Sequence, residues 1–269
     1  YIFYIYMEEK HIFLLWLQGW ENAPWLSKQV AESWKMNNPD WKINYIDLEN
    51  LKDYVNDIDY IYDTDKTITP QAKSDIIRLS LLKNHGGIWA DATMLCMQPL
   101  DHWVHETVEK IGMWMYRGGG YRGKIPHSWG WASWFIVAKK NNEIINKWKD
   151  ACDRYWEKNN KALEYFWMDR LLHGIFIHNK EIKQKWLRCP ALCCEDDGQS
   201  HTLAKHNNGV DNNTPHIKEL FLEKPPYALK LWKHYSIFLS NESEKSINSN
   251  GYYAIEMSKR KYCYKHIMK

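Results

Sequence analysis

Short apolar runs alternate with longer helix-like runs over the first ninety residues, and this alternation limits the folds open to the chain. The apolar runs at 11–17, 42–47 and 88–91 have the length and composition of buried strands. An alternation of strand and helix predicts a parallel α/β sheet. Ligands bind to open sheets of this class outside the carboxyl ends of the strands, so we expect a site at that edge.

Proline and glycine mark the bounds of the two helices between these strands. The Ala-Pro pair at 23–24 opens a helix that we expect to end near Lys35. Thr69 is a good N-cap and is followed by proline at the first helical position, so a second helix should begin there. It should end near Asn84, because the glycine pair at 86–87 is a typical helix C-cap.

The second half of the chain has a different pattern. Apolar runs at 111–116 and 131–138 indicate two strands around a glycine-rich loop at 117–123. The segments 141–159 and 164–176 have the periodicity of helices. We interpret the glycine-rich loop and the tryptophans after it as a candidate wall for an acceptor, with a plain surface loop as the alternative.

Composition narrows the class of protein. The 269 residues are 45% hydrophobic and 26% charged, which suits a globular domain with a sizeable core. A net charge of +3 is too balanced to predict nucleic-acid binding. No apolar run reaches the roughly 18 residues of a membrane-spanning helix. We expect a cytoplasmic protein, with peripheral membrane contact through a basic tail as the open variant.

Two charged residues stand out on the second predicted helix. Asp75 and Arg78 are three positions apart and therefore share a helix face. One interpretation is a surface ion pair of little energetic value. The rest of the helix is apolar from Ile76 to Leu82, however, and a charged pair on a core helix favours a cleft. There the carboxylate would accept hydrogen bonds from sugar hydroxyls and the guanidinium would bind hydroxyls or phosphate.

Asp91 and Thr93 follow the third predicted strand. On an extended segment their side chains point the same way, because they are two positions apart. Two oxygen ligands that point together suit a hard divalent cation. Such a cation assists the departure of a diphosphate by neutralising charge on the leaving oxygen. The D-x-T pattern is weak by itself and gains weight from its place after a strand.

The chain resembles the capsular polysaccharide synthesis glycosyltransferases, which are related to glycosyltransferase family 32 and carry a D-x-D motif. The S-D-x-x-R and G-G-x-x-x-D patterns in TPQAKSDIIRLSLLKNHGGIWADAT carry most of the resemblance. The other matching stretches lie in the family order at 13–41, 131–142 and 163–172. The second aspartate of D-x-D is Thr93 here, which is a poorer metal ligand.

The resemblance implies a GT-A fold, which is a Rossmann-like α/β fold with a mixed sheet flanked by helices. It implies a glycosyltransferase domain over 1–240, with a nucleotide-sugar-binding half at 11–100 and an acceptor-side half at 101–240. The remaining segment, 241–269, is predicted to be a polar linker and a basic tail.

The resemblance also assigns a nucleotide site. Trp16, Gln18 and Gly19 would lie at the nucleotide, with the Trp16 indole stacked on uracil. Lys230 would bind a phosphate. The alternative for Lys230 is a solvated surface lysine.

The donor sugar, the metal and the chemistry are assigned in the same way. Asp75 and Arg78 would hold the donor sugar, while Asp91, Thr93 and His234 would bind Mn²⁺ or Mg²⁺. His234 has the alternative of an ordinary surface histidine.

Two carboxylates are the candidate catalytic groups of the chain. They are Asp91 and Asp169. Asp169 would orient the acceptor hydroxyl, or act as a base if the reaction inverts. The alternative for Asp169 is an ion pair with Arg170.

These features predict a metal-assisted glycosyltransferase. It would transfer a sugar from a nucleotide-sugar donor, UDP-linked, to a hydroxyl of a cell-surface or capsid glycan or polysaccharide, with retention at the anomeric carbon. A non-catalytic glycan-binding protein is one alternative, because Thr93 replaces an aspartate. A glycoside hydrolase is another, and it requires two carboxylates roughly 5 to 9.5 Å apart. Dependence on a nucleotide separates the transferase from both.

Overall fold

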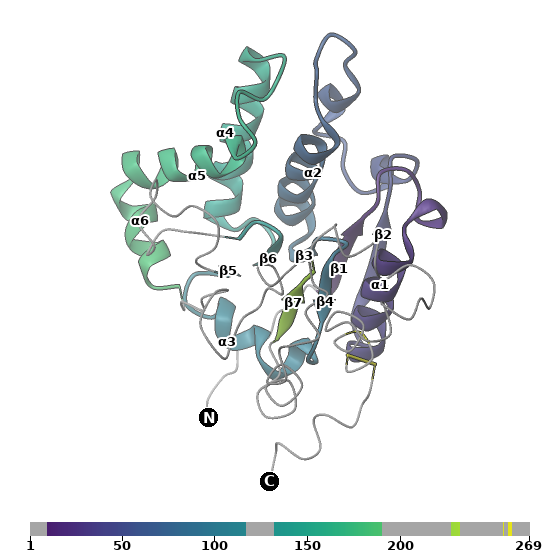
Figure 1. Cartoon of the computed structure of the whole chain (residues 1–269). Coiled ribbons are helices and arrows are strands. Elements are labelled where there is room, and N and C mark those ends of the chain that lie inside the picture. Colours follow the sequence, from purple (N-terminus) through teal and green to yellow (C-terminus); the bar gives the residue numbers. More distant parts are fainter. Residues whose placement is uncertain (1–9, 117–131, 190–226, 232–254, 256–257, 260–269) are drawn as a thin grey trace, which may run out of the picture.

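A five-stranded mixed sheet forms the centre of the protein, with the strand order β2-β1-β3-β6-β5. The computed structural model describes residues 10–116, 132–189, 227–231, 255 and 258–259. The strands of this sheet are β1 (His11–Leu15), β2 (Lys42–Ile46), β3 (Gly87–Ala90), β5 (Met113–Met115) and β6 (Phe135–Ala138). Figure 1 shows them running across the middle of the molecule from β5 to β2.

The sheet combines a parallel half and an antiparallel half. β1 pairs in parallel with both β2 and β3. β6 pairs antiparallel with β3 and with β5. Every residue of β3 and β6 is buried, so both faces of the sheet centre are covered. This arrangement confirms the expected α/β class with a mixed sheet flanked by helices.

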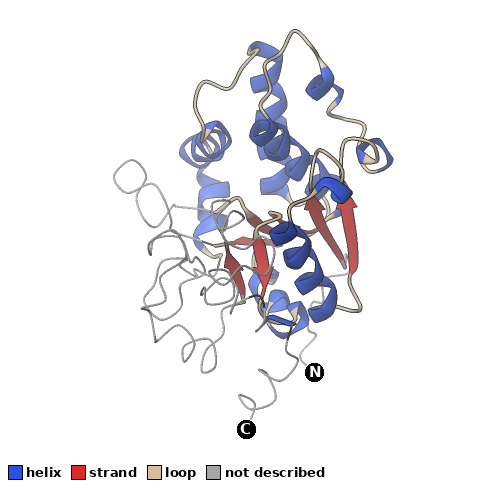
Figure 2. Cartoon of the chain, turned by 45° about the vertical axis from the view of Figure 1, so that its right-hand side comes forward, coloured by secondary structure: helices blue, strands red, loops and turns tan. Residues whose placement is uncertain are grey.

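The helices surround this sheet (Figure 2). They are α1 (Trp25–Asn37), α2 (Pro70–His85), α3 (Val104–Val108), α4 (Glu143–Lys158), α5 (Trp167–His178) and α6 (Lys180–Leu187). Short 3-10 turns occur at Trp20–Asn22, Leu51–Asp53, Asp59–Tyr62 and Leu100–His102. α2 packs on β1 and β3 and also contacts α4, while α5 contacts both α4 and α6. These four helices form a helical layer, whose α4–α6 part lies towards the β5 side of the sheet in Figure 1.

The ends of α2 follow from its sequence. The Thr69 hydroxyl accepts a hydrogen bond from the Ala72 N–H at 3.2 Å, as an N-cap should. At the other end Gly86 and Gly87 have φ values of 67° and 98°. A Cβ at Gly87 would lie 2.5 Å from the backbone oxygen of His11, so only glycine lets β3 approach β1 so closely. The predicted helix and its two end signals are confirmed.

A second, two-stranded sheet was not anticipated by the sequence pattern. β4 (Met94–Cys96) pairs antiparallel with β7 (Ala228–Lys230), and the partner of Met94 is Lys230. Strands of three residues are too short to show a period of two. The pairing connects the segment after β3 to a segment more than a hundred residues later, as the adjacent β4 and β7 arrows in Figure 1 show.

Other boundaries differ from the expectation by a few residues. The helix expected over 164–176 begins at Trp167, and the strand expected over 111–116 is limited to Met113–Met115. The glycine-rich loop and the polar linker lie outside the described residues. Within the described ranges, the helices are all too short or too polar to cross a bilayer.

Candidate functional site

Asp91 follows β3 directly and opens a tight turn. Its N–H donates to the Trp134 carbonyl oxygen at 2.9 Å, and its own carbonyl accepts from the Met94 N–H at 2.7 Å. The segment from Asp91 to Met94 is therefore a β-turn, so the prediction of an extended backbone here is wrong. The expected convergence of the side chains still occurs, because the Asp91 carboxylate and the Thr93 hydroxyl both contact the ammonium of Lys230.

The Asp91 carboxylate is surrounded by donors. Lys230 Nζ lies 2.7 Å from Oδ2, and the Trp89 indole N–H donates to Oδ1 at 3.0 Å. Arg78 Nη2 lies 3.5 Å from the same Oδ1. Burial alone would raise the pKa of Asp91, but the Lys230 and Arg78 charges and these hydrogen bonds outweigh it and hold the pKa below its ordinary value. Asp91 is therefore a fixed anion at neutral pH.

Arg78 joins the two carboxylates of the site. Its Nη2 lies 3.1 Å from Asp75 Oδ1, and its Nη1 donates to the Ser133 carbonyl oxygen at 2.7 Å. Ser74 accepts from the same guanidinium at 3.2 Å, and the Trp89 ring lies 5.0 Å from the guanidinium carbon. With 7% of its side chain exposed, Arg78 is not the surface pair that was the alternative interpretation.

Asp75 has an environment that opposes its charge. Burial raises the pKa of Asp75 to about 6, and the Arg78 charge offsets that only in part while Asp91 adds to it. The indole N–H of buried Trp167, at the start of α5, also favours the charged form, although it makes no hydrogen bond of ordinary geometry within the described part of the chain. A carboxylate in this state gains stability from a hydrogen-bonding ligand.

The segment before α5 lies near these carboxylates. The pKa of Tyr165 is raised by desolvation first and then by the charges of Asp75, Asp91 and, more weakly, Asp169. Most of the Tyr165 side chain is nevertheless exposed, at 73%. It therefore combines an open aromatic surface with a position beside the anionic site.

Asp169 lies in the first turn of α5 and is half-buried. Its expected alternative partner, Arg170, binds Glu164 instead, with Nε and Oε1 2.8 Å apart. The Arg170 guanidinium thus has a carboxylate partner in the turn that precedes the helix, rather than in its chain neighbour.

The three residues expected at the nucleotide follow β1. Trp16 is half-buried, and its indole has no hydrogen bond and no stacked ring within the described residues. Gln18 is exposed. Gly19 has φ 88°, and a Cβ there would collide with the Glu21 carboxylate. Because β1 and β3 are parallel neighbours, this turn and Asp91 lie at the same edge of the sheet.

The oxygen groups of the described residues do not fit a divalent cation. Mn²⁺ or Mg²⁺ takes about six oxygen ligands and is usually bound by carboxylates. Here Asp91 supplies one carboxylate, Thr93 supplies a neutral hydroxyl, and the Lys230 ammonium lies within 2.8 Å of both. No group of three potential acidic, histidine or cysteine ligands occurs in the described residues. His234 lies outside them.

Several residues of the site were not identified from the sequence. They are Trp89, Ser133, Trp134, Tyr165 and Trp167. Trp89 could have been identified from the alternation of side chains along a strand, because it lies two positions before Asp91 and therefore on the same face. The others contribute through tertiary contacts that a local pattern does not record.

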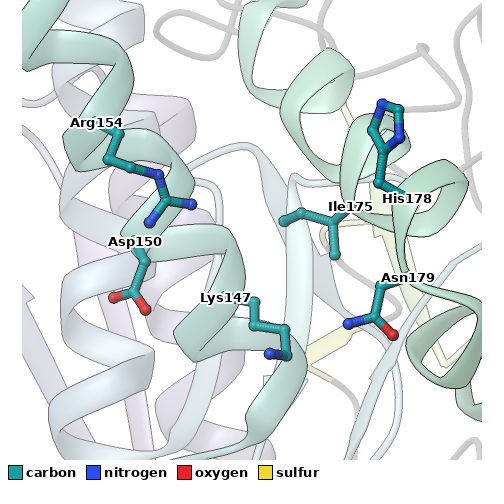
Figure 3. Close-up of a pocket in the computed structure, with 6 residues that line it drawn as sticks. All are labelled: Lys147, Asp150, Arg154, Ile175, His178 and Asn179. Carbon is teal, nitrogen blue, oxygen red and sulfur yellow. The ribbon is translucent and has the colours of Figure 1, made fainter.

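A separate pocket of about 310 Å³ lies between α4 and α5 (Figure 3). Its lining residues are Lys147, Asp150, Arg154, Ile175, His178 and Asn179. None of them belongs to the carboxylate cluster or to the expected site residues. Asp150 is paired with Lys83 of α2 at 3.4 Å, which ties the rim of this pocket to the helical layer.

Comparison with known proteins finds relatives that are named as glycosyltransferases. The chain is 24% identical over 161 residues to "O-glycosyltransferase braB" of Annulohypoxylon truncatum, which covers 55% of this chain and 38% of the relative. It is 25% identical over 162 residues to "Glycosyltransferase afumC" of Aspergillus fumigatus, which covers 56% of this chain and 41% of that relative. The chain thus spans about two fifths of the length of these relatives.

A solved structure and a family profile also match. The structure of "PaToxG Glycosyltransferase" covers 66% of this chain and 73% of its own, with a TM-score of 0.41 and 19% identity. The profile of the family described as "Capsular polysaccharide synthesis protein" matches residues 4–221, which is most of the chain. The chain therefore belongs to the capsular polysaccharide synthesis protein family.

Proposed function

We propose that this protein is a glycosyltransferase that moves a sugar from a nucleotide-sugar donor, UDP-linked, to a hydroxyl of a cell-surface or capsid glycan. The observation that carries the proposal is the cluster of Asp75, Arg78 and Asp91 at the carboxyl end of β3. Its two anions and its buried cation are held in fixed geometry at the same edge of the sheet as a turn with the half-buried Trp16 indole, which stacks on no ring among the described residues. A nucleotide sugar presents hydroxyls, phosphates and a flat base, which match these three kinds of group.

Asp75 is the proposed ligand of the donor sugar. Burial raises its pKa more than the Arg78 charge lowers it, so the ionised carboxylate would be stabilised by further hydrogen-bond donors. Sugar hydroxyls would supply the missing donors, and Arg78 would hold the carboxylate in place at 3.1 Å. Binding of the sugar would thus favour the ionised form of Asp75.

Trp16, Gln18 and Gly19 are the proposed nucleotide contacts. An indole face stacks on any base, and stacking of this kind contributes about 1–3 kcal/mol per base. Gly19 lets the backbone approach a ligand closely. The exposed Gln18 would then supply a polar contact to the edge of the base or to the ribose.

The acceptor side is proposed to lie at the start of α5. Tyr165 offers an open ring next to the carboxylates, and Asp169 is the proposed group that orients the acceptor hydroxyl. In the reaction, the bond from the anomeric carbon to the donor phosphate oxygen breaks, and the acceptor oxygen forms the new bond. We propose retention of configuration, with catalysis mostly by positioning and by stabilisation of the leaving group.

A metal remains a separate part of the prediction. Mn²⁺ or Mg²⁺ was expected on Asp91, Thr93 and His234, and it would supply charge neutralisation to the departing diphosphate. The described oxygen groups do not fit such an ion. None of the roles given above to Asp75, Arg78, Trp16 and Asp169 requires it.

The first experiment is a thermal-shift screen of the full chain. Nucleoside diphosphates and nucleotide sugars are each added in the presence of Mn²⁺ and after removal of metal by a chelator. A ligand of the native state raises the unfolding midpoint by mass action. We expect UDP or a UDP-sugar to raise it. A screen in which free oligosaccharides raise the midpoint and nucleotides do not would overturn the transferase in favour of a glycan-binding protein or a hydrolase.

A further inference from the structure

Lys230 occupies the position at which a cation was expected. Its ammonium lies 2.7 Å from Asp91 Oδ2 and 2.8 Å from Thr93 Oγ1, and these are the two side chains expected to bind a divalent metal. The charge is therefore already present in the chain, on a side chain that belongs to β7. Figure 1 shows β7 beside β4, which begins directly after Thr93.

The backbone holds this lysine in place from both sides. Lys230 is the register partner of Met94 in the β4–β7 pair. The next residue, Leu231, donates its N–H to the Thr93 carbonyl oxygen at 2.8 Å. The Lys230 side chain is 14% exposed, and its ammonium lies 5.9 Å from the centre of the Trp134 ring. These contacts distinguish it from a solvated surface lysine.

The charges of the cluster are already balanced without a further cation. Asp75 and Asp91 supply two negative charges, while Arg78 and Lys230 supply two positive charges. Both oxygens of Asp91 accept hydrogen bonds, from Lys230 and from Trp89. A divalent ion placed here would have to displace the ammonium or lie beside it at a repulsive distance.

We propose that Lys230 replaces the divalent metal as the cation that stabilises the leaving nucleoside diphosphate, so that sugar transfer needs no added metal. The inference rests on the proposed function, because it requires a diphosphate leaving group. An ammonium has three N–H donors, and two of those of Lys230 are used by Asp91 and Thr93. The third is directed to an oxygen of the diphosphate.

The electron and proton balance of the step is simple. When the bond between the anomeric carbon and the phosphate oxygen breaks, its electron pair stays on that oxygen, and the diphosphate gains one negative charge. The Lys230 ammonium offsets this charge and keeps its own protons. The hydroxyl proton of the acceptor passes to the departing phosphate oxygen as the new glycosidic bond forms.

The test compares metal dependence in the wild-type chain and in lysine variants. Binding of UDP and GDP is measured by calorimetry, and release of the diphosphate from the matching nucleotide sugars is measured as turnover, with chelator or with Mn²⁺. We expect both to be unchanged by the chelator in wild type. Lys230→Gln should lose turnover by about 100-fold or more, as after removal of one donor to a developing anion. Lys230→Arg should retain part of the turnover, because it keeps the charge.

Two further measurements make each outcome decisive. Lys52→Ala, at an exposed lysine paired with Asp59, is the matched control and should leave binding and turnover unchanged. Circular dichroism of Lys230→Gln checks that it folds, and if it does not, Lys230→Arg takes over as the test variant. Nucleotide binding and turnover that vanish with the chelator and return with Mn²⁺ would overturn the role of Lys230 while leaving the transferase intact. Absence of nucleotide binding under both conditions would overturn the transferase as well.

Discussion

Two clusters of charged side chains lie within the helical and sheet layers of this protein, and they differ in the environment of one carboxylate, Asp75. One, the Lys149 cluster, joins the 3-10 segment near Tyr60 to α2 and α4. The Lys149 ammonium is fully buried and lies 2.7 Å from Asp153 and 3.1 Å from Asp57. Tyr60 donates to Asp153 at 2.8 Å, and the Ser80 hydroxyl donates to Asp57. The other cluster is that of Asp75, Arg78, Asp91 and Lys230.

The difference lies in how completely the anions are satisfied. In the Lys149 cluster, burial would raise the pKa of Asp57, but the Ser80 hydrogen bond and the Lys149 charge outweigh it and lower the pKa below its ordinary value. In the second cluster the pKa of Asp91 is lowered in the same way, by Lys230 and Arg78, whereas burial raises the pKa of Asp75 to about 6. A cluster that only supports the fold supplies its own partners, whereas a cluster that binds a ligand keeps a carboxylate short of them.

The largest effect on stability should come from Lys149. Lys149→Ala leaves Asp57 and Asp153 without their buried counter-ion; because about a third of each carboxylate is exposed to water, we expect a cost of about 1–3 kcal/mol. Urea unfolding of the variant should show that loss at neutral pH. The turnover of the molecules that remain folded should not change, because this cluster shares no residue with the donor site.

Lys158→Ala is the matched control for this variant, since Lys158 is an exposed lysine on the same helix. It should change the free energy of unfolding by less than about 0.5 kcal/mol. Equal losses from the two lysines would mean that the Lys149 cluster is not a stabilising unit, and the contrast between the clusters would fail.

The largest effect on activity within the second cluster should come from Asp75. Asp75→Asn keeps the shape of the side chain and removes the anion that would accept hydrogen bonds from the sugar. We expect turnover to fall by about 100-fold or more, with UDP affinity retained, because the nucleotide contacts lie after β1. Calorimetry with UDP and with the nucleotide sugar separates the two effects. Loss of UDP affinity instead would place Asp75 at the nucleotide.

The sequence predicted three members of the second cluster, Asp75, Arg78 and Asp91, better than the fourth, Lys230. Asp75, Arg78 and Asp91 lie within one strand–helix–strand unit, where helical spacing and strand ends determine position. Lys230 reaches the same point through a strand of three residues, 139 positions after Asp91. Nothing in the local pattern records such a pairing, which is why Lys230 was expected at a phosphate and not on the carboxylate.

The fold shows the same division. The bounds of α2 were predictable because capping residues act locally, through the hydroxyl of Thr69 and the conformation of Gly86. β4 and β7 exist only because they pair with each other, and α6 has just eight residues. The turn at Asp91 also depends on a distant partner, the Trp134 carbonyl, so the sequence alone suggested an extended segment there.

Asp75 should also make stability depend on pH with a definite sign. Its pKa in the folded state is about 6, above the ordinary value of 3.8, so the folded state binds the proton more tightly than the unfolded state. Stability is therefore lost as pH rises from about 4 to about 6, and the loss is complete above that range. The full shift corresponds to at most about 3 kcal/mol.

This pH effect can be isolated with the same variant. Asp75→Asn cannot ionise, so it should be as stable as wild type near pH 4 and more stable at pH 7, as measured by urea unfolding across that range. The corresponding variant of the Lys149 cluster, Asp57→Asn, should be less stable than wild type at pH 7, because the pKa of Asp57 is lowered. Two variants that respond in the same direction would remove the electrostatic distinction between the clusters.

The smallest expected effect is on UDP affinity, and it compares two tryptophans of the turn after β1, Trp16 and Trp20. Trp16→Ala should weaken UDP binding by about ten- to a hundredfold, the cost of one lost base–aromatic stack. Trp20→Phe is the control in the same turn, since the Trp20 ring packs edge-on against Tyr45 and its N–H donates to the Ile46 carbonyl at 3.1 Å. It should alter stability and leave UDP affinity unchanged.

The two aromatic residues differ as the two charged clusters do. Trp20 has its partners within the fold, whereas the Trp16 indole has no partner among the described residues. If Trp20→Phe lowers UDP affinity and Trp16→Ala does not, a lack of partners within the described fold does not mark the ligand-binding residue among the aromatic side chains, even if it does among the charged ones.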